Sequence, residues 1–335
     1  MIRRSLLAAC GALSLSLSAC PKSEDVIVHT GQGKEKTAQQ IDADALALLP
    51  GGAITVGMLD AQALFASQFG DKLLEVAKRR APVPEAAGFD PKRDITKVYF
   101  GVYSMQGADV AGVAVGTFDP KKIEAAADGV QKTPLGVPVT KSTYAGRALY
   151  TAESVGFTVL TTRTALFGNQ TGIRRSLDRI KEGTAKRQLA PWAEKVLSQG
   201  STVPFAFGSN LKENPVPNAL RSKLPFLDGV ETVSVVGNFS SPGVNLAGTL
   251  VYPDETAAKT GASKVAETRA MLDTYTPFLA LLGIPQPVRK LEADAVGKEG
   301  HFVAGIDAVA FSSLLSRLDD LLGALPKASP APVSQ

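Results

Sequence analysis

Few side chains in this chain of 335 residues have the type and spacing that catalysis needs. Ser209 and Lys212 are spaced as S-x-x-K, and Lys259-Thr260-Gly261 is a K-T-G triplet; such motifs can supply a serine nucleophile and its lysine base. That serine must open a helix, but Asn214-Pro215-Val216-Pro217 would interrupt a helix within one turn. The triplet must lie on a strand, yet it falls in an alanine-rich run typical of a helix. We therefore predict no serine nucleophile.

Histidines and paired carboxylates are also poorly placed for catalysis. His29 lies in a polar segment and His301 opens an expected strand, so they share no metal-ligand or dyad spacing. Two carboxylate pairs occur, Asp42 with Asp44 and Asp319 with Asp320. Acid–base catalysis needs two carboxyl groups at a set distance in a cleft, whereas neighbours on a helix or tether point apart. We predict no catalytic residue, no metal and no cofactor.

The first twenty residues combine positive charge, an apolar run and a cysteine. Arg3 and Arg4 precede an apolar run over residues 6–17, and Leu17-Ser18-Ala19-Cys20 follows. This order is typical of a secretory signal peptide. The run is shorter than the roughly 20 residues of a membrane-spanning helix. We expect an exported protein whose leader is removed.

The segment Leu17-Ser18-Ala19-Cys20 resembles the lipobox of bacterial lipoproteins. The resemblance implies cleavage between Ala19 and Cys20, attachment of diacylglycerol to the Cys20 sulfur, and acylation of the new amine. One acyl chain anchors only marginally, at about 0.8 kcal/mol per buried methylene, so three chains on one residue give a stable anchor. The expected partner is a membrane bound through this lipid. The expected location is the envelope of a Gram-negative bacterium, on the outer membrane or facing the periplasm.

Composition describes a globular body without thiol chemistry. Of its residues 44% are hydrophobic and 20% charged, and the formal net charge is +4. Such a balance lacks the basic stripe that nucleic-acid binding needs, so we expect no nucleic-acid partner. Cys10 leaves with the leader and lipid occupies Cys20, so the mature body contains neither a disulfide nor a thiolate site.

Changes in composition divide the chain into five expected parts. They are a signal peptide over 1–19, a lipidated cysteine and flexible tether over 20–40, a first α+β repeat over 41–183, a second over 184–325, and a disordered tail over 326–335. The tether is polar and contains glycines and lysines, and the tail is rich in Pro, Ala and Ser.

A recurring order of strand, aspartate and helix supports the two repeats. The four aspartates are expected helix N-caps: Asp60, Asp119, Asp254 and Asp307. Two predicted hairpins, over 95–119 and 230–254, share a further likeness, because Val110-Ala111-Gly112 matches Leu246-Ala247-Gly248. We predict an α+β fold of antiparallel sheets with helices packed on one face, and an internal duplication.

The body resembles uncharacterised exported lipoproteins of Gram-negative bacteria that carry paired α+β repeats. The shared cues are Gly88-Phe89-Asp90-Pro91 with Asp94, and Ala165-Leu166-Phe167-Gly168 before a helix. The resemblance implies no particular activity. We expect a non-enzymatic, membrane-anchored lipoprotein that binds a protein partner or an apolar ligand; a lipid carrier would need an apolar cavity between sheet and helices. The alternative is an envelope hydrolase whose site is assembled from residues distant in sequence.

Overall fold

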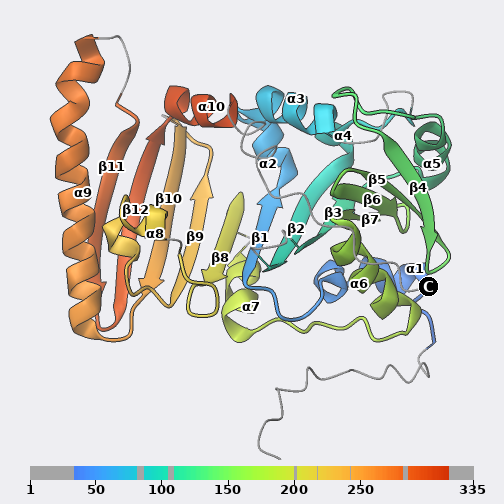
Figure 1. The fold of residues 1–335 in the computed structure, drawn as a ribbon, viewed down its shortest axis with the longest axis horizontal. Coiled ribbons are helices and arrows are strands. Elements are labelled where there is room, and N and C mark those ends of the chain that lie inside the picture. The colour runs from blue at the N-terminus through green and yellow to red at the C-terminus, as the bar shows by residue number, and fades with distance from the viewer. Residues whose placement is uncertain are drawn as a thin grey trace, which may run out of the picture. The chain divides into compact units, whose positions relative to one another are not determined.

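The structure is a computed structural model that describes residues 34–80, 87–104, 109–199, 202–216, 218–241, 243–281 and 286–316. Ala19, Cys20 and the expected tail lie outside these residues. Within them, twelve strands form one sheet in the order β11-β12-β10-β9-β8-β1-β2-β3-β7-β6-β5-β4 (Figure 1). The two expected repeats therefore contribute to one continuous sheet.

Seven strands come from the first half of the chain. They are β1 (Thr55–Asp60), β2 (Ile95–Ser104), β3 (Asp109–Gly116), β4 (Val139–Tyr144), β5 (Arg147–Ala152), β6 (Val155–Val159) and β7 (Thr164–Gly168). The helices of this half are α1 (Ala38–Ala43), η1 (Ala45–Leu48), α2 (Ala61–Ala66), α3 (Gly70–Arg80), α4 (Pro91–Asp94), α5 (Pro120–Asp128) and α6 (Gln170–Lys181).

Five strands come from the second half. They are β8 (Phe205–Asn210), β9 (Thr232–Asn238), β10 (Gly243–Val251), β11 (Val288–Val296) and β12 (Glu299–Asp307). The helices of this half are α7 (Pro191–Ser198), α8 (Asn218–Arg221), η4 (Pro225–Leu227), α9 (Glu255–Leu281) and α10 (Ala308–Ser316). No helix among the described residues is long and apolar enough to cross a bilayer.

All strand pairs among the described residues are antiparallel, which confirms the predicted α+β fold with an antiparallel sheet. From the central β1–β8 pair outward, β1-β2-β3-β7-β6 and β8-β9-β10-β12-β11 have the same pairing order. Gly112 on β3 and Gly248 on β10 occupy equivalent positions in this order, and each pairs with a phenylalanine of the next strand. This order agrees with an internal duplication, which stays a prediction.

The four predicted N-caps are confirmed. Each aspartate accepts a hydrogen bond from a backbone N–H of the first helical turn: Asp60 from Ala63, Asp119 from Lys122, Asp254 from Ala257, and Asp307 from Val309. These bonds satisfy donors that the helix leaves unpaired, and the carboxylates suit the positive end of the helix dipole. The capping aspartate is the last residue of β1 and β12 and follows within three residues of the end of β3 and β10.

Helices cover the two halves of the sheet differently. Ile173 and Leu177 of α6 pack with Val113 and Leu166 on one face of the first half. Ile123 of α5 packs in a separate cluster on the opposite face of those strands. In the second half, α9 contacts β11 and β12, while α7 packs on β1 and β8 (Figure 1). Helices thus cover both faces of the first half, whereas the sequence analysis expected helices on one face.

Local departures from the predictions have physical reasons. The expected tether over 20–40 is structured near its end, because the Lys36 N–H donates to the Ile180 carbonyl at 3.0 Å and Ile41 is fully buried. Pro277 lies inside α9, which continues through it. The helix that Asp307 caps is α10, and residues beyond 316 lie outside the described part.

A candidate apolar ligand pocket

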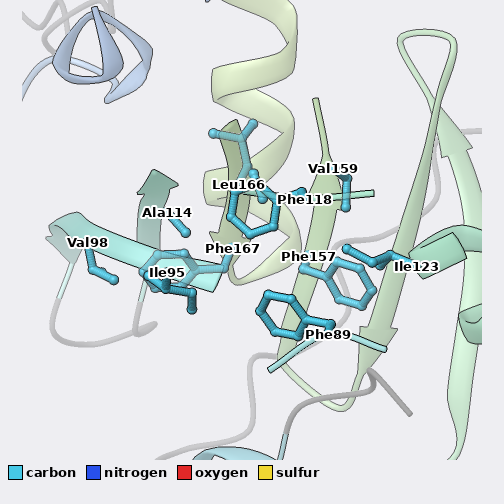
Figure 2. A pocket seen from close by; sticks show the side chains of 11 residues that line it. Phe89, Ile95, Val98, Ala114, Phe118, Ile123, Phe157, Val159, Leu166 and Phe167 are labelled. Atoms are coloured by element: carbon cyan, nitrogen blue, oxygen red, sulfur yellow. The ribbon is translucent and has the colours of Figure 1, made fainter. Parts of the chain in front are cut away.

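A pocket of about 290 Å³ lies between the sheet and α5 (Figure 2). Its lining exposes only apolar surface and contains no titratable side chain. The lining residues are Phe89, Ile95, Val98, Ala114, Phe118, Ile123, Phe157, Val159, Ala165, Leu166 and Phe167. Concave, mostly apolar pockets that are already formed are typical of small-molecule sites.

Strand register explains the shape of the pocket. Ala114 on β3 pairs with Ala165 on β7, and Ala165 pairs with Val159 on β6, so the three side chains lie in one row on one face. In the next row Phe157 pairs with Phe167. Small side chains in one row beside large rings in the other leave the hollow above the alanines.

Glycines in the strands hold the phenylalanine rings close to the sheet. The ring of Phe167 lies over Gly112, so that an added Cβ at Gly112 would come within 3.0 Å of it. The ring of Phe100 lies over Gly57 in the same way. A ring laid over glycine covers a strand position that lacks a side chain. The rings therefore lie low, and space remains above them.

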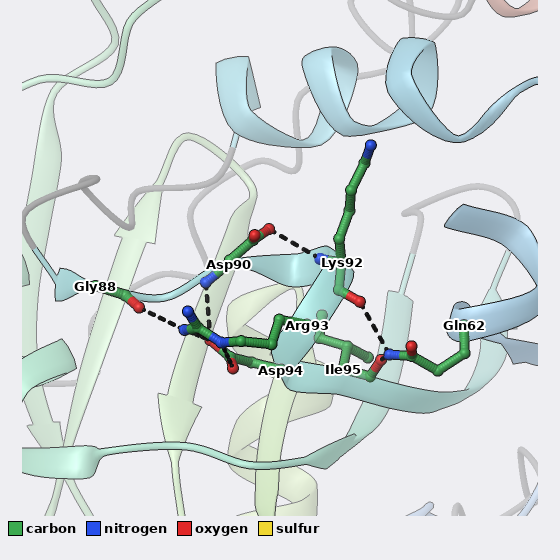
Figure 3. A network of polar contacts seen from close by, with 7 residues as sticks. All are labelled: Gln62, Gly88, Asp90, Lys92, Arg93, Asp94 and Ile95. Carbon is green, nitrogen blue, oxygen red and sulfur yellow. Dashed lines mark hydrogen bonds and ion pairs between the residues drawn. The ribbon is translucent and has the colours of Figure 1, made fainter. Parts of the chain in front are cut away.

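The outer wall is formed by Phe89, whose ring stacks on Phe118 at 5.9 Å between centroids. Figure 3 shows the polar network that fixes the segment around Phe89. Asp90 caps α4 by accepting from the Lys92 N–H at 3.1 Å, and the Asp94 carboxylate accepts from the Asp90 N–H at 2.8 Å. These two bonds hold the residue before α4 and the last residue of α4 in fixed positions.

Arg93 and Gln62 complete this network. The Arg93 guanidinium donates to both Asp94 oxygens, at 2.6 and 2.7 Å, and to the Gly88 carbonyl at 2.8 Å. Gln62 of α2 donates to the carbonyls of Lys92 and Ile95. The hydrogen bond from Arg93 outweighs partial burial and holds the pKa of Asp94 below its usual value. The carboxylate is therefore charged at neutral pH, and the wall of the pocket is preorganised.

The structure separates the residues of the S-x-x-K and K-T-G motifs. Ser209 lies in β8, where its hydroxyl hydrogen-bonds Thr55, and Lys212 pairs with Glu231. The K-T-G triplet lies within α9. Neither motif has the local structure that its chemistry requires, as predicted from the prolines and the alanine-rich run.

The remaining candidates have structural partners where they are described. His301 Nδ1 lies 3.3 Å from the Thr249 hydroxyl, and Asp42 accepts hydrogen bonds from Thr161 and Thr164. Asp44 pairs with Arg187. His29, Asp319 and Asp320 lie outside the described residues. Within the described ranges, no group of three or more His, Cys, Asp or Glu side chains could hold a metal ion.

Sequence reasoning missed the pocket but came close to its walls. The two cues Gly88-Phe89-Asp90-Pro91 and Ala165-Leu166-Phe167-Gly168 border it. The usable signal was the spacing of phenylalanine, alanine and glycine in short strands, which leaves gaps on one face. Strand pairing decides which of these residues become neighbours, and the pairing cannot be read from the sequence of one strand alone.

The fold and the pocket define an α+β protein with an apolar site between an antiparallel sheet and a helix. Neither a protein-family model nor a curated protein matches this chain. Among solved structures, crystal form III of TP0453 is similar, with a TM-score of 0.50 and 11% identity over 81% of this chain and 97% of that chain. Crystal form I of TP0453 has a TM-score of 0.47 and 13% identity over 82% and 96%. At such identity the likeness concerns the fold alone.

Proposed function

We propose that this protein is a non-enzymatic, membrane-anchored envelope lipoprotein that binds an apolar ligand between its sheet and α5. The observation that carries the proposal is the wholly apolar lining of the pocket. An apolar cavity of about 150 Å³ in another protein stays dry and binds benzene. The pocket here, at about 290 Å³, is larger. Burial of ligand surface in it supplies the driving force, at about 25 cal/mol per Å².

The absence of polar side chains from the lining favours binding over chemistry. Nucleophilic and acid–base catalysis both require polar groups within reach of the bound molecule. The eleven lining residues supply none. The hydrolase alternative therefore has no support from this pocket, and the protein-partner alternative stays a prediction.

The proposed anchor is the lipid on Cys20. Lys34, the first described residue, lies 14 positions after Cys20. At about 3.4 Å per residue an extended segment of that length reaches about 48 Å. A body on such a tether has access to apolar molecules at the membrane to which it is attached.

A charge placed in the pocket tests the proposal. Val98 is half-buried and lines the pocket, whereas Val251 is half-buried on the opposite face of the sheet. The chain is exported with Cys20→Ala, purified without detergent, and titrated with a fluorescent apolar dye. We expect Val98→Asp to abolish dye binding and Val251→Asp to retain it. Equal binding by both variants, or none by the parent, would overturn the proposal.

A further inference from the structure

The geometry points to a single linear hydrocarbon chain as the ligand, carried by an amphiphile whose polar end stays outside the pocket. This inference rests on the proposed function and narrows it to one chemical class.

A polar group has no partner inside the pocket. Burial of a hydroxyl or amide without a hydrogen bond is unfavourable, and burial of an unpaired charge is far more so. The lining offers only hydrocarbon. A ligand with a polar end must therefore leave that end in water, while its hydrocarbon part enters.

Apolar side chains continue on the same face of the sheet from the pocket as far as Phe205, which packs against the cluster of Phe69 and Val244. Val98 lines the pocket on β2 and pairs with Leu59 on β1, which pairs with Phe205 on β8. In the adjacent row of the same face, Phe100 and Phe207 flank Gly57. The Phe207 side chain is 37% exposed, which is high for a phenylalanine in a central strand.

These paired residues form a row that runs across the strands. From β7 to β8 it crosses four strand spacings, each about 4.8 Å, for a length of about 19 Å. A linear chain can follow such a strip while its end occupies the pocket. A rigid fused-ring molecule would fill the pocket but could not follow the strip, so the shape favours an unbranched chain.

The Gly112–Phe167 pair limits the depth of the pocket. Phe167 lines the pocket, and its ring has no room to move toward the sheet once a Cβ is added at Gly112. Gly112→Ala must lift the ring into the space that the chain would occupy. Gly248 offers a control in the other half, because Phe302 covers it, together with the Ser234 carbonyl, and Phe302 lines no part of this pocket.

A chain-length series tests the inference on the full mature chain with Cys20→Ala. The probes are saturated fatty acids of about eight to eighteen carbons, with cholate as the fused-ring comparison; each buried methylene adds about 0.8 kcal/mol, or about fourfold in affinity. We expect affinity to rise with chain length in this way until pocket and strip are filled, and cholate to bind weakly. Gly112→Ala should bind long chains about tenfold more weakly, and Gly248→Ala should bind them as the parent does.

Two outcomes overturn the inference and leave apolar binding intact. The first is dye binding by a protein whose affinity for fatty acids does not depend on their chain length. The second is an equal effect of Gly112→Ala and Gly248→Ala on fatty-acid binding. Failure of the parent protein to bind either dye or fatty acid would instead overturn the proposed function. Ala114→Val is a second variant, because its added methyl groups take up pocket volume whether or not Gly112→Ala folds. It is expected to weaken long-chain binding as well, and unchanged binding would count against the inference.

Discussion

Phe167 on β7 lies over Gly112 on β3, where even one added carbon would come within 3.0 Å of its ring. The pair links fold and site, since the ring covers the strand and also lines the pocket. The same relationship joins Phe302 to Gly248 in the second half. The short likeness between Val110-Ala111-Gly112 and Leu246-Ala247-Gly248 thus coincides with a shared packing arrangement.

Replacement of Gly112 by alanine is expected to lower the free energy of unfolding by about 1–3 kcal/mol, the usual cost of overpacking. Urea denaturation measures this change. Gly129→Ala is the control, because its Cβ would meet its nearest neighbour at an ordinary 3.5 Å. A Gly112→Ala protein as stable as Gly129→Ala would contradict the packing described for the β3–β7 pair.

The network at Asp94 is expected to govern both stability and ligand binding. Asp94→Ala removes the acceptor of Arg93 and of the Asp90 N–H, which should cost about 1–3 kcal/mol and loosen the Phe89 wall. Asp71→Ala is the matched control, because Asp71 pairs with Lys92 through a side chain that is 90% exposed. Dye titration and urea denaturation on both variants check this. An Asp94→Ala protein with parental dye affinity would show that the network does not shape the pocket.

The Asp307–Arg289 ion pair should give stability a defined pH dependence. Burial alone would raise the pKa of Asp307, but the Arg289 guanidinium and two backbone N–H groups outweigh it and lower that pKa from 3.8. Since the folded state holds the proton less tightly than the unfolded chain, the pair stabilises fully above about pH 3.8 and loses its effect as the pH falls through the folded pKa.

Arg289→Gln should therefore lower the free energy of unfolding by about 2–3 kcal/mol at neutral pH, with a difference from the parent that shrinks in acid. Lys290→Gln, which breaks an exposed pair with Glu292, should change it little. Urea unfolding from about pH 2 to 7 would reveal the dependence, because the loss takes place below about pH 3.8. A constant difference between Arg289→Gln and the parent over that range would refute the assignment.

Membrane attachment is expected to depend on one sulfur atom. Cys20→Ala in the chain with its leader removes the proposed acylation site, so the protein should move from the membrane fraction to the soluble fraction. Cys10→Ala should leave it in the membrane, because residue 10 lies in the segment proposed to be cleaved. Fractionation after a carbonate wash is the measurement. Retention of Cys20→Ala in the membrane would rule out the lipid anchor.

Elements with local signals could be predicted from the sequence. The capping aspartates marked the starts of four helices, and the turns marked the hairpins formed by β2 with β3 and by β9 with β10. These signals act over a few residues, so they survive in a single sequence. The joining of both halves through β1 and β8 depends on contacts about 150 residues apart, and no local pattern encodes it.

The pocket was harder to predict than the helix caps for the same reason. Phe89, Ile123 and Phe167 come from three separate segments and meet only after the sheet has formed. Gly112 entered the sequence analysis only through its likeness to Gly248, whereas in the structure it makes room for a ring from the neighbouring strand. A glycine opposite a phenylalanine can be recognised only when the register of the two strands is known.

Native mass spectrometry of the exported Cys20→Ala chain, purified without detergent, tests the central claim most directly. The account predicts a bound species in the mass range of single-chain amphiphiles that leaves on activation, and its absence from Val98→Asp. A bare protein mass for the parent chain that persists after incubation with fatty acids would contradict the claim that this pocket holds an apolar ligand.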